Sequence, residues 1–247
     1  MTSSLPAQPN RSLLEGIEVL LAVSQSDKPV RVRALARELN MTPTRVQRFL
    51  GTLRHLGLTE QHQDRRYGVG PGIHALSAIA LSASGLAGRA LTILPRLNDL
   101  RMVVALGVLW RDTVSYFYFN TPGIPSSQSL GKPNGYPARD SSIGLLLLAE
   151  KDASYLDTFF PGQQENLQEP LREVRQKGYA SIRKESGETS MAVPVGNPTI
   201  AGLAIAGNFS AIREKSLLAR LIQTARALDT PPVDPLTPQP NNPLTFL

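Results

Sequence analysis

The chain has 247 residues, of which 41% are hydrophobic and 19% charged, as expected for an ordinary soluble protein with two domains. It contains no cysteine, which excludes disulfides, thiolate metal sites and thiol nucleophiles. The formal net charge is +6, and residues 1–72 hold ten basic against six acidic side chains, but a basic balance alone would fit nucleic acid, a membrane surface or an acidic protein.

The first residues, 1–10, are polar and are expected to be disordered, and they lack the charged-then-apolar pattern of a signal peptide. An amphipathic helix follows, and its predicted core-facing residues are Leu13, Leu14, Ile17, Leu20 and Leu21. The longest weakly polar run, 75–88, is too short and too rich in serine, alanine and glycine to span a bilayer. We therefore expect a cytoplasmic protein with no membrane partner.

Two short helices are predicted next, with a tight break at residues 40–41. Apolar residues recur at helical spacing in both; they are Val32, Leu35, Ala36 and Leu39 in the first helix, and Val46, Phe49, Leu50, Leu53 and Leu56 in the second. Thr42 is placed as the N-cap of the second helix and Pro43 at its first position, where a missing N–H costs nothing. A short hairpin with arginines at its turn follows. This order predicts a winged helix-turn-helix domain over residues 11–70.

The side of the second helix opposite its apolar stripe carries hydrogen-bond donors and small residues, and no carboxylate. Between Arg31 and His55 the chain has six arginines against one acid, Glu38, which is the sign needed to bind phosphates. An arginine-tipped hairpin can lie on the phosphate backbone beside a major groove. The pattern favours DNA binding over the alternative, a winged helix that serves as a protein-interaction module.

The side chains predicted to contact DNA lie on the second helix, just ahead of the helix pair and on the hairpin. They are Arg31, Thr42, Thr44, Arg45, Gln47, Arg48, Thr52, Arg65 and Arg66. Arg48 and Gln47 are the first candidates for base edges, because arginine pairs with guanine and glutamine with adenine through two hydrogen bonds. The residues at the start of the helix are expected to make phosphate or mixed contacts, and the two hairpin arginines to grip the backbone.

Residues 71–87 are predicted to form a linker of one or two helices that joins two domains and offers a subunit contact; an ordinary buried helix is the alternative. A second domain is predicted over residues 88–229. It has strand pairs at 103–110 with 114–119 and at 190–195 with 200–206, and helices at 141–150, 155–160, 167–177 and 213–228. Strands and helices in separated runs indicate an α+β fold. The proline-rich tail, 230–247, is expected to be disordered.

Catalytic and metal sites find little support in the sequence. The three histidines, His55, His62 and His74, all lie in or beside the predicted winged helix. No His-x-x-x-His spacing, no Gly-x-Ser-x-Gly elbow and no glycine-rich phosphate loop occurs. The pair Ser141-Ser142 has no histidine in its domain to act as a base. We expect no catalytic residue, no metal and no cofactor, and therefore no enzyme.

The ordered motifs resemble the IclR family of bacterial transcription regulators from about Arg11 to Leu228. RSLLEGIEVLLAV resembles the family's opening helix, LARELNMTPTRVQRFLGTLRHLGL its helix pair, and RRYGVGPGI the end of its wing. GYPARDSSIGLLLLA, KGYAS, GETSMAVPV and IAGLAIAG resemble a helix and the core strands of its effector domain. The resemblance implies a homodimer or dimer of dimers that binds double-stranded operator DNA and senses a small molecule through a GAF-like effector domain. Repression and activation both stay open.

The same resemblance implies an effector site made of Arg139, Ser142, Ile143, Arg183, Ser190, Ala204 and Ala206. The last two stand where ligand-contacting serines can occur in the family. Loss of these hydroxyls and the presence of Ile143 imply a more apolar pocket, while Arg139, Arg183 and Lys184 offer cationic partners. We therefore expect a larger carboxylate with an apolar or aromatic body rather than a small oxo-acid. A ligand-independent regulator with a degenerate sensor domain is the alternative.

Overall fold

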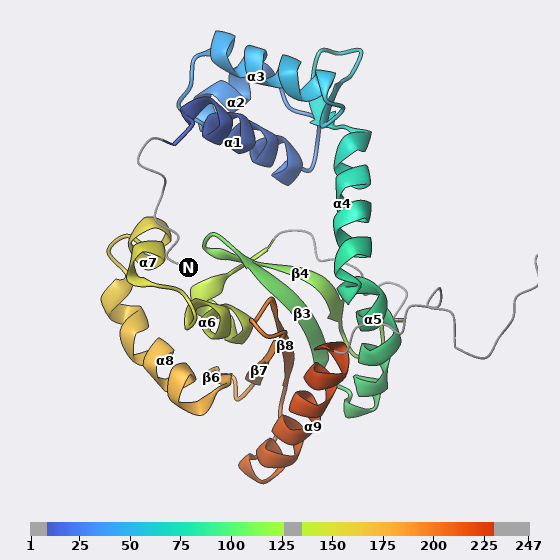
Figure 1. Cartoon of the computed structure of the whole chain (residues 1–247), viewed down its shortest axis with the longest axis vertical. Helices are drawn as coiled ribbons and strands as arrows, with labels where there is room; N and C mark the ends of the chain where they lie inside the picture. Colours follow the sequence, from blue (N-terminus) through green and yellow to red (C-terminus); the bar gives the residue numbers. More distant parts are fainter. Residues whose placement is uncertain (1–8, 126–134, 230–247) are drawn as a thin grey trace, which may run out of the picture. The chain divides into compact units, whose positions relative to one another are not determined.

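The computed structural model describes residues 9–125 and 135–229. Most of the predicted disordered N-terminus and the whole proline-rich tail lie outside these described residues. The chain forms two compact units, Met1–Ser84 and Gly85–Leu247, each with a core of its own (Figure 1). No helix in the described ranges is both long and apolar enough to cross a membrane.

Unit 1 is a three-helix core with a hairpin and one further helix. Its elements are α1 (Arg11–Gln25), α2 (Val32–Glu38), α3 (Pro43–His55), β1 (Thr59–Gln61), β2 (Tyr67–Val69) and α4 (Pro71–Ser84). Strands β1 and β2 pair antiparallel and form the wing, and a bridge between Val30 and Tyr67 joins the wing to the segment ahead of α2. The predicted winged helix-turn-helix is confirmed.

Helix α1 buries a different side from the one predicted. Leu13, Leu14 and Ile17, three of its five predicted core residues, are 63%, 41% and 38% exposed. The buried residues are instead Glu15, Val19, Ala22 and Val23. A Cβ at Gly16 would lie 3.6 Å from Phe49 Cδ1, so the missing side chain lets the Phe49 ring of α3 pack directly on α1. The helix therefore docks on the side that admits this ring, and Leu13 and Leu14 stay outside.

Helix α4 is exposed along its middle. All residues from 74 to 80 are exposed, including Leu76 at 55% and Ile79 at 67%. This helix is therefore not the ordinary buried helix that the sequence left open. The linker segment contains two helices, because Gly85, with a φ of 60°, separates α4 from α5 (Leu86–Ile93). Glycine adopts this left-handed conformation without the steric cost that other residues incur.

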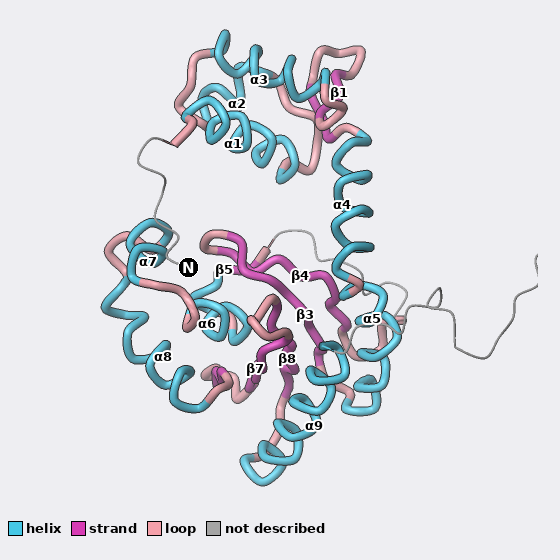
Figure 2. The backbone as a smooth tube through the Cα atoms, in the orientation of Figure 1, coloured by secondary structure: helices cyan, strands magenta, loops and turns pink. Residues whose placement is uncertain are grey.

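Unit 2 is built on one antiparallel sheet. Its remaining helical elements are η1 (Leu94–Leu100), η3 (Ala138–Asp140), α6 (Ser142–Leu148), α7 (Ala153–Phe159), α8 (Gln164–Lys177) and α9 (Ala211–Asp229). Its strands are β3 (Val103–Trp110), β4 (Thr113–Asn120), β5 (Tyr136–Pro137), β6 (Ala180–Arg183), β7 (Thr189–Val195) and β8 (Ala201–Gly207). Within the described residues the strand order is β5-β4-β3-β8-β7-β6 (Figure 2). The predicted α+β fold and both predicted strand pairs are confirmed.

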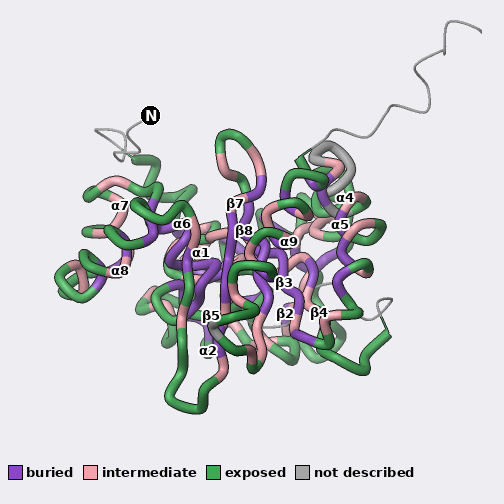
Figure 3. The backbone as a smooth tube through the Cα atoms, turned by 90° about the horizontal axis from the view of Figure 1, so that it is seen from below, coloured by how far each residue is buried: buried purple, intermediate pink, exposed green. Residues whose placement is uncertain are grey.

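Helices cover both faces of this sheet. Elements α5, η1 and α9 pack on one face around a core that includes Leu106 and Leu203. Helices α6 and α8 pack on the other face around a core that includes Ile143 and Ala192. Strands β7 and β8 are consequently buried over most of their length, and β3 over half of its length (Figure 3).

A β-bulge in β4 decides which aromatic side chains face which core. The register with β3 shifts beside Gly107, and Phe117 is the extra residue between the paired positions Tyr116 and Tyr118. Strict alternation would put Tyr116 and Tyr118 on one face and Phe119 on the other. Instead Tyr118 belongs to the core under α9, whereas Tyr116 and Phe119 both pack on the α6 side. The bulge thus brings two rings together on the face where α6 begins.

Gly144 allows α6 to approach η3. A Cβ at this position would collide with the backbone carbonyl of Ala138. We expect Gly144→Ala to lower the free energy of unfolding of unit 2 by about 1–3 kcal/mol or more, because a backbone cannot move aside as a flexible side chain can. Gly88→Ala in α5 is the control, since a Cβ there meets no described atom within 4 Å. Urea unfolding followed by circular dichroism checks both; equal midpoints would contradict the packing argument.

Candidate DNA-binding surface and effector pocket

Helix α3 is fixed by a buried apolar side. Its buried residues are Val46, Phe49, Leu50 and Leu53. Thr42 caps its start by accepting a hydrogen bond from the backbone N–H of Arg45 at 3.4 Å, and Pro43 takes the first helical position, as predicted. Leu56, predicted as a fifth core residue, is 61% exposed because the helix ends at His55 and Leu56 is its C-cap.

The opposite side of α3 forms a recognition face, which we define as Thr44, Arg48, Gly51, Thr52 and His55. All of these residues are exposed. The guanidinium of Arg48 lies 5.9 Å from the centroid of the Phe49 ring, and Thr52 Oγ1 donates to the Arg48 carbonyl oxygen at 3.1 Å. A Cβ at Gly51 would meet nothing within 4 Å. None of the described carboxylates pairs with Arg48, so its charge is available to an external anion or base.

One flank of the recognition face is bonded to α1. Arg45 forms an ion pair with Glu15, a carboxylate that is only 8% exposed and that also accepts a hydrogen bond from Arg11 at 3.0 Å. A buried carboxylate requires such partners, because burial without them is strongly unfavourable. Arg45, predicted to contact DNA, is therefore engaged within unit 1 through at least one of its nitrogens.

The other flank is bonded to the wing. Gln47 Nε2 donates to the Tyr67 hydroxyl of β2 at 2.9 Å, and Arg54 Nη1 donates to Gln61 Oε1 of β1 at 2.9 Å. Neither bond was predicted from the sequence, because each joins α3 to a strand of the wing and depends on how the two elements pack. Helix and wing are thus joined by two side-chain hydrogen bonds beside the recognition face.

The remaining predicted DNA contacts lie on the wing and ahead of α2. Arg65 is exposed at the tip of the wing, where its φ is 61°. Arg66 pairs with Asp64 at 3.0 Å, which neutralises part of its charge. Arg31 is exposed at the N-cap of α2. Arg65 and Arg31 are therefore the more available cations of this group.

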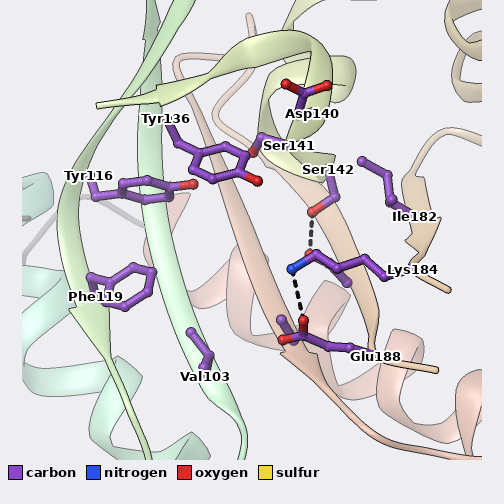
Figure 4. A pocket seen from close by; sticks show the side chains of 12 residues that line it. Val103, Tyr116, Phe119, Tyr136, Asp140, Ser141, Ser142, Ile182, Lys184 and Glu188 are labelled. Atoms are coloured by element: carbon purple, nitrogen blue, oxygen red, sulfur yellow. Dashed lines mark hydrogen bonds and ion pairs between the residues drawn. The ribbon is translucent and has the colours of Figure 1, made fainter. Parts of the chain in front are cut away.

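Unit 2 contains a pocket of about 170 Å³ (Figure 4). Aromatic rings line one side of it and polar side chains the other; the rings are Tyr116, Phe119 and Tyr136, and the polar groups include Ser142, Lys184, Glu188 and Ser190. The rings of Tyr116 and Phe119 meet edge to face with centroids 5.3 Å apart, as the bulge in β4 requires. A smaller cavity of about 70 Å³ shares much of this lining and also touches Ile143 and Ala204.

The polar side chains of the pocket bond to one another. The hydroxyls of Ser142 and Ser190 are 2.7 Å apart, and Lys184 Nζ donates to Glu188 Oε2 at 2.8 Å. The Glu188 carboxylate raises the pKa of Lys184, so this lysine is charged at neutral pH. Burial raises the pKa of the Tyr116 hydroxyl, which therefore keeps its proton at neutral pH.

Five of the seven predicted effector residues line the two cavities; they are Ser142, Ile143, Ser190, Ala204 and Ala206. Arg139 and Arg183 do not line either cavity: Arg139 donates to Gln163, and Arg183 Nε donates to Thr189 Oγ1 at 3.3 Å. Sequence reasoning missed the three aromatic rings and Glu188. Alternation of side chains is the usual signal for a shared sheet face, and the bulge removes it in β4.

Comparison with known proteins supports the resemblance found in the sequence. Residues 12–63 match the IclR helix-turn-helix domain. The HTH-type transcriptional regulator KdgR of Dickeya chrysanthemi is 27% identical over 234 residues, which cover 85% of this chain and 75% of KdgR. The chain therefore carries an IclR helix-turn-helix domain. It is an IclR-type transcription regulator with a DNA-binding helix-turn-helix, and the resemblance found in its motifs is confirmed.

Solved IclR structures share the fold over most of the chain. An IclR family transcriptional regulator from Brucella abortus aligns with a TM-score of 0.72 at 20% identity, covering 92% of this chain and 95% of that one. An IclR homologue from Microbacterium hydrocarbonoxydans, solved in complex with 4-hydroxybenzoate, aligns with a TM-score of 0.64 at 20% identity, covering 88% and 97%. These likenesses show the fold alone.

The ion pair between Glu15 and Arg45 leads to a prediction about salt dependence. We expect Glu15→Gln to release Arg45 for phosphate contact, so that the plot of log affinity against log salt becomes steeper by about 0.9. Glu18→Gln removes the same charge from the same helix and is the matched control. Fluorescence anisotropy with a random-sequence duplex at several salt concentrations measures both slopes. If the two variants share one slope, Glu15 does not restrain Arg45.

Proposed function

We propose that this IclR-type protein is a sequence-specific regulator that acts in the cytoplasm and responds to a small-molecule effector, a carboxylate with an apolar or aromatic body. The observation that carries the proposal is the recognition face of α3, where Arg48 is exposed on a helix whose other side is locked in a core. Side chains on a rigid element present the same geometry at every encounter. A helix of this kind fits the major groove, where all four base pairs can be distinguished.

Different side chains of unit 1 have different proposed roles. Arg48 and Gln47 pair with base edges, whereas Arg65 and Arg31 contact phosphates from outside the groove. Arg66 contributes less because Asp64 shares its charge. The threonines of α3 and its N-cap make phosphate or mixed contacts at the rim of the groove. Arg45 joins them when it leaves its ion pair with Glu15.

A homodimer supports this mode of binding. Two copies place two recognition helices in successive major grooves of a near-palindromic operator. The apolar side chains Leu76 and Ile79 are exposed on α4 and favour burial against a second copy of the chain. Further contacts between such dimers would give a dimer of dimers.

The pocket of unit 2 is the proposed effector site. Three rings can stack on an aromatic or apolar body, and Lys184 offers a cation to its carboxylate. The IclR homologue solved with 4-hydroxybenzoate has the same fold and supports an aromatic acid as the effector class. Arg139 and Arg183, proposed earlier from the sequence as further cations, would have to leave Gln163 and Thr189 to reach such a ligand.

A ligand-independent regulator is the second candidate, and one observation favours it. Lys184 is already neutralised by Glu188, and Ser142 and Ser190 already satisfy each other. Polar groups that already bond to one another contribute less binding free energy to a ligand than groups without a hydrogen-bond partner. An effector must therefore compete with Glu188 for Lys184.

An effector would regulate by changing the separation of the two winged helices of the dimer through residues 72–100. A ligand shifts such an equilibrium only by its different affinity for the two arrangements. Whether the bound state represses or activates a gene depends on where the operator lies relative to the promoter.

The division of roles on DNA can be tested by substituting the two arginines. Arg48→Ala should weaken binding to the selected operator by about 1–3 kcal/mol and relax the preference at one base pair per half-site. Arg65→Ala should weaken all sequences alike and reduce the salt slope by about one. Competition binding with operator and random duplexes over a range of salt measures both effects.

Arg96→Ala in unit 2 serves as the control for these arginine variants, because it removes one positive charge outside the winged helix. It should leave operator preference unchanged. The assignment of Arg48 to bases and Arg65 to phosphates would be wrong if Arg48→Ala and Arg65→Ala preferred operator over random DNA to the same degree.

The proposed role of Lys184 in the effector site can be tested by ligand binding. Lys184→Met should weaken binding of 4-hydroxybenzoate or benzoate by about tenfold or more, the effect of losing one charge-assisted hydrogen bond. Lys151→Met is the matched control, because Lys151 lies over the ring of Tyr155 and outside the pocket. Isothermal titration calorimetry with these acids, glyoxylate and pyruvate is the measurement. Tighter binding of the oxo-acids than of either aromatic acid would contradict the proposed class, and turnover of any of them would reveal an enzyme.

A further inference from the structure

The hydrogen bond between Gln47 and Tyr67 joins a proposed base-reading side chain to the wing. Gln47 Nε2 lies 2.9 Å from the Tyr67 hydroxyl oxygen. Gln47 is exposed beside the recognition face, whereas Tyr67 is only 1% exposed. The bond therefore runs from the surface that faces DNA to a side chain in the core of unit 1.

Tyr67 has little freedom to move. Its ring belongs to the apolar core that α1, α2 and α3 share. Its backbone exchanges two hydrogen bonds with Val30, each of 2.8 Å, and pairs with Gln61 across the wing. The phenolic oxygen is thus held at a fixed place beside α3, and a surface side chain bonded to it is held as well.

This bond leaves Gln47 with the groups that an adenine requires. A glutamine amide has two N–H donors and a carbonyl acceptor. One N–H is directed to Tyr67, so one donor and the acceptor remain. The major-groove edge of adenine offers an acceptor, N7, and a donor, the N6 amino group. A glutamine ordered before binding also loses less conformational entropy when the pair forms.

We propose that Tyr67 is a positioning residue for base recognition: its hydroxyl fixes the orientation of the Gln47 amide. The inference rests on the proposed function, because it requires α3 to enter the major groove. Tyr67 is buried and does not itself touch DNA. Its influence on sequence preference passes through Gln47.

The variant Tyr67→Phe tests this role, since it removes the hydroxyl and keeps the ring in the core. Duplexes are selected from a random library with the full-length protein and then compared with their single-base changes by competition binding. We expect Tyr67→Phe to lower the preference for one adenine-containing pair per half-site by about 3- to 10-fold, as for the loss of one neutral hydrogen bond. Affinity for random DNA and its salt slope should not change, because no phosphate contact is lost.

Two further variants separate positioning from stability. Gln47→Ala should lose the preference at the same base pair, and adding Tyr67→Phe to it should have no further effect there. Tyr118→Phe removes the hydroxyl of another fully buried tyrosine, in unit 2, whose oxygen accepts a hydrogen bond from Asn120 at 3.3 Å. This matched control should leave base preference unchanged.

Each outcome decides one question. The inference would be wrong if Tyr67→Phe left the base preference unchanged. It would also be wrong if adding Tyr67→Phe to Gln47→Ala lowered the preference as much as Tyr67→Phe does alone. Neither result would contradict DNA recognition by α3. A wild-type protein that selects no sequence would overturn the proposed function itself. If Tyr67→Phe fails to fold, as judged by circular dichroism, Gln47→Ala still decides: unchanged preference in that variant overturns the inference, and a loss at one pair supports it.

Discussion

Burial of one side of α3 is the constraint on which the DNA-binding surface depends. With Val46, Phe49 and Leu53 packed against the rest of unit 1, the helix cannot turn about its axis, and Arg48 must project away from the core. The hydrophobic contribution of a few such side chains is on the order of several kcal/mol, which is comparable with the stability of a small domain. The same contacts therefore fold the unit and orient the surface that we propose meets DNA.

Bonds at both flanks refine this orientation. Arg45 is held to α1 through Glu15, and Gln47 is held to the wing through Tyr67. An exposed side chain that is bonded at its tip has fewer conformations to lose on binding, so part of the ordering cost is met during folding. The recognition face thus combines a central arginine, Arg48, which is available to an external partner, with neighbours whose positions the fold prescribes.

In unit 2 a single extra residue in β4 determines which side chains face the pocket. The bulge at Phe117 turns Tyr116 and Phe119 to the same face of the sheet, beside the start of α6. These rings give the pocket an aromatic wall, while Lys184 and Glu188 neutralise each other on the other side. The pocket is consequently apolar on one side and electrostatically balanced on the other, a combination that favours an amphipathic ligand over a small, highly charged one.

The sequence by itself determined the order of elements, the apolar stripes of α2 and α3, the cap at Thr42, the two strand pairs and five of the residues that line the cavities. These features follow from local periodicity, cap chemistry and motif order, which are properties of short stretches of chain. Only the tertiary structure decided which side of α1 is buried, which ring faces the pocket and which side chains hold Gln47 and Arg45. The physical reason is that these outcomes depend on partners distant in sequence: a glycine that admits a ring, a bulge that breaks alternation, and a buried hydroxyl or carboxylate brought within bonding distance by packing.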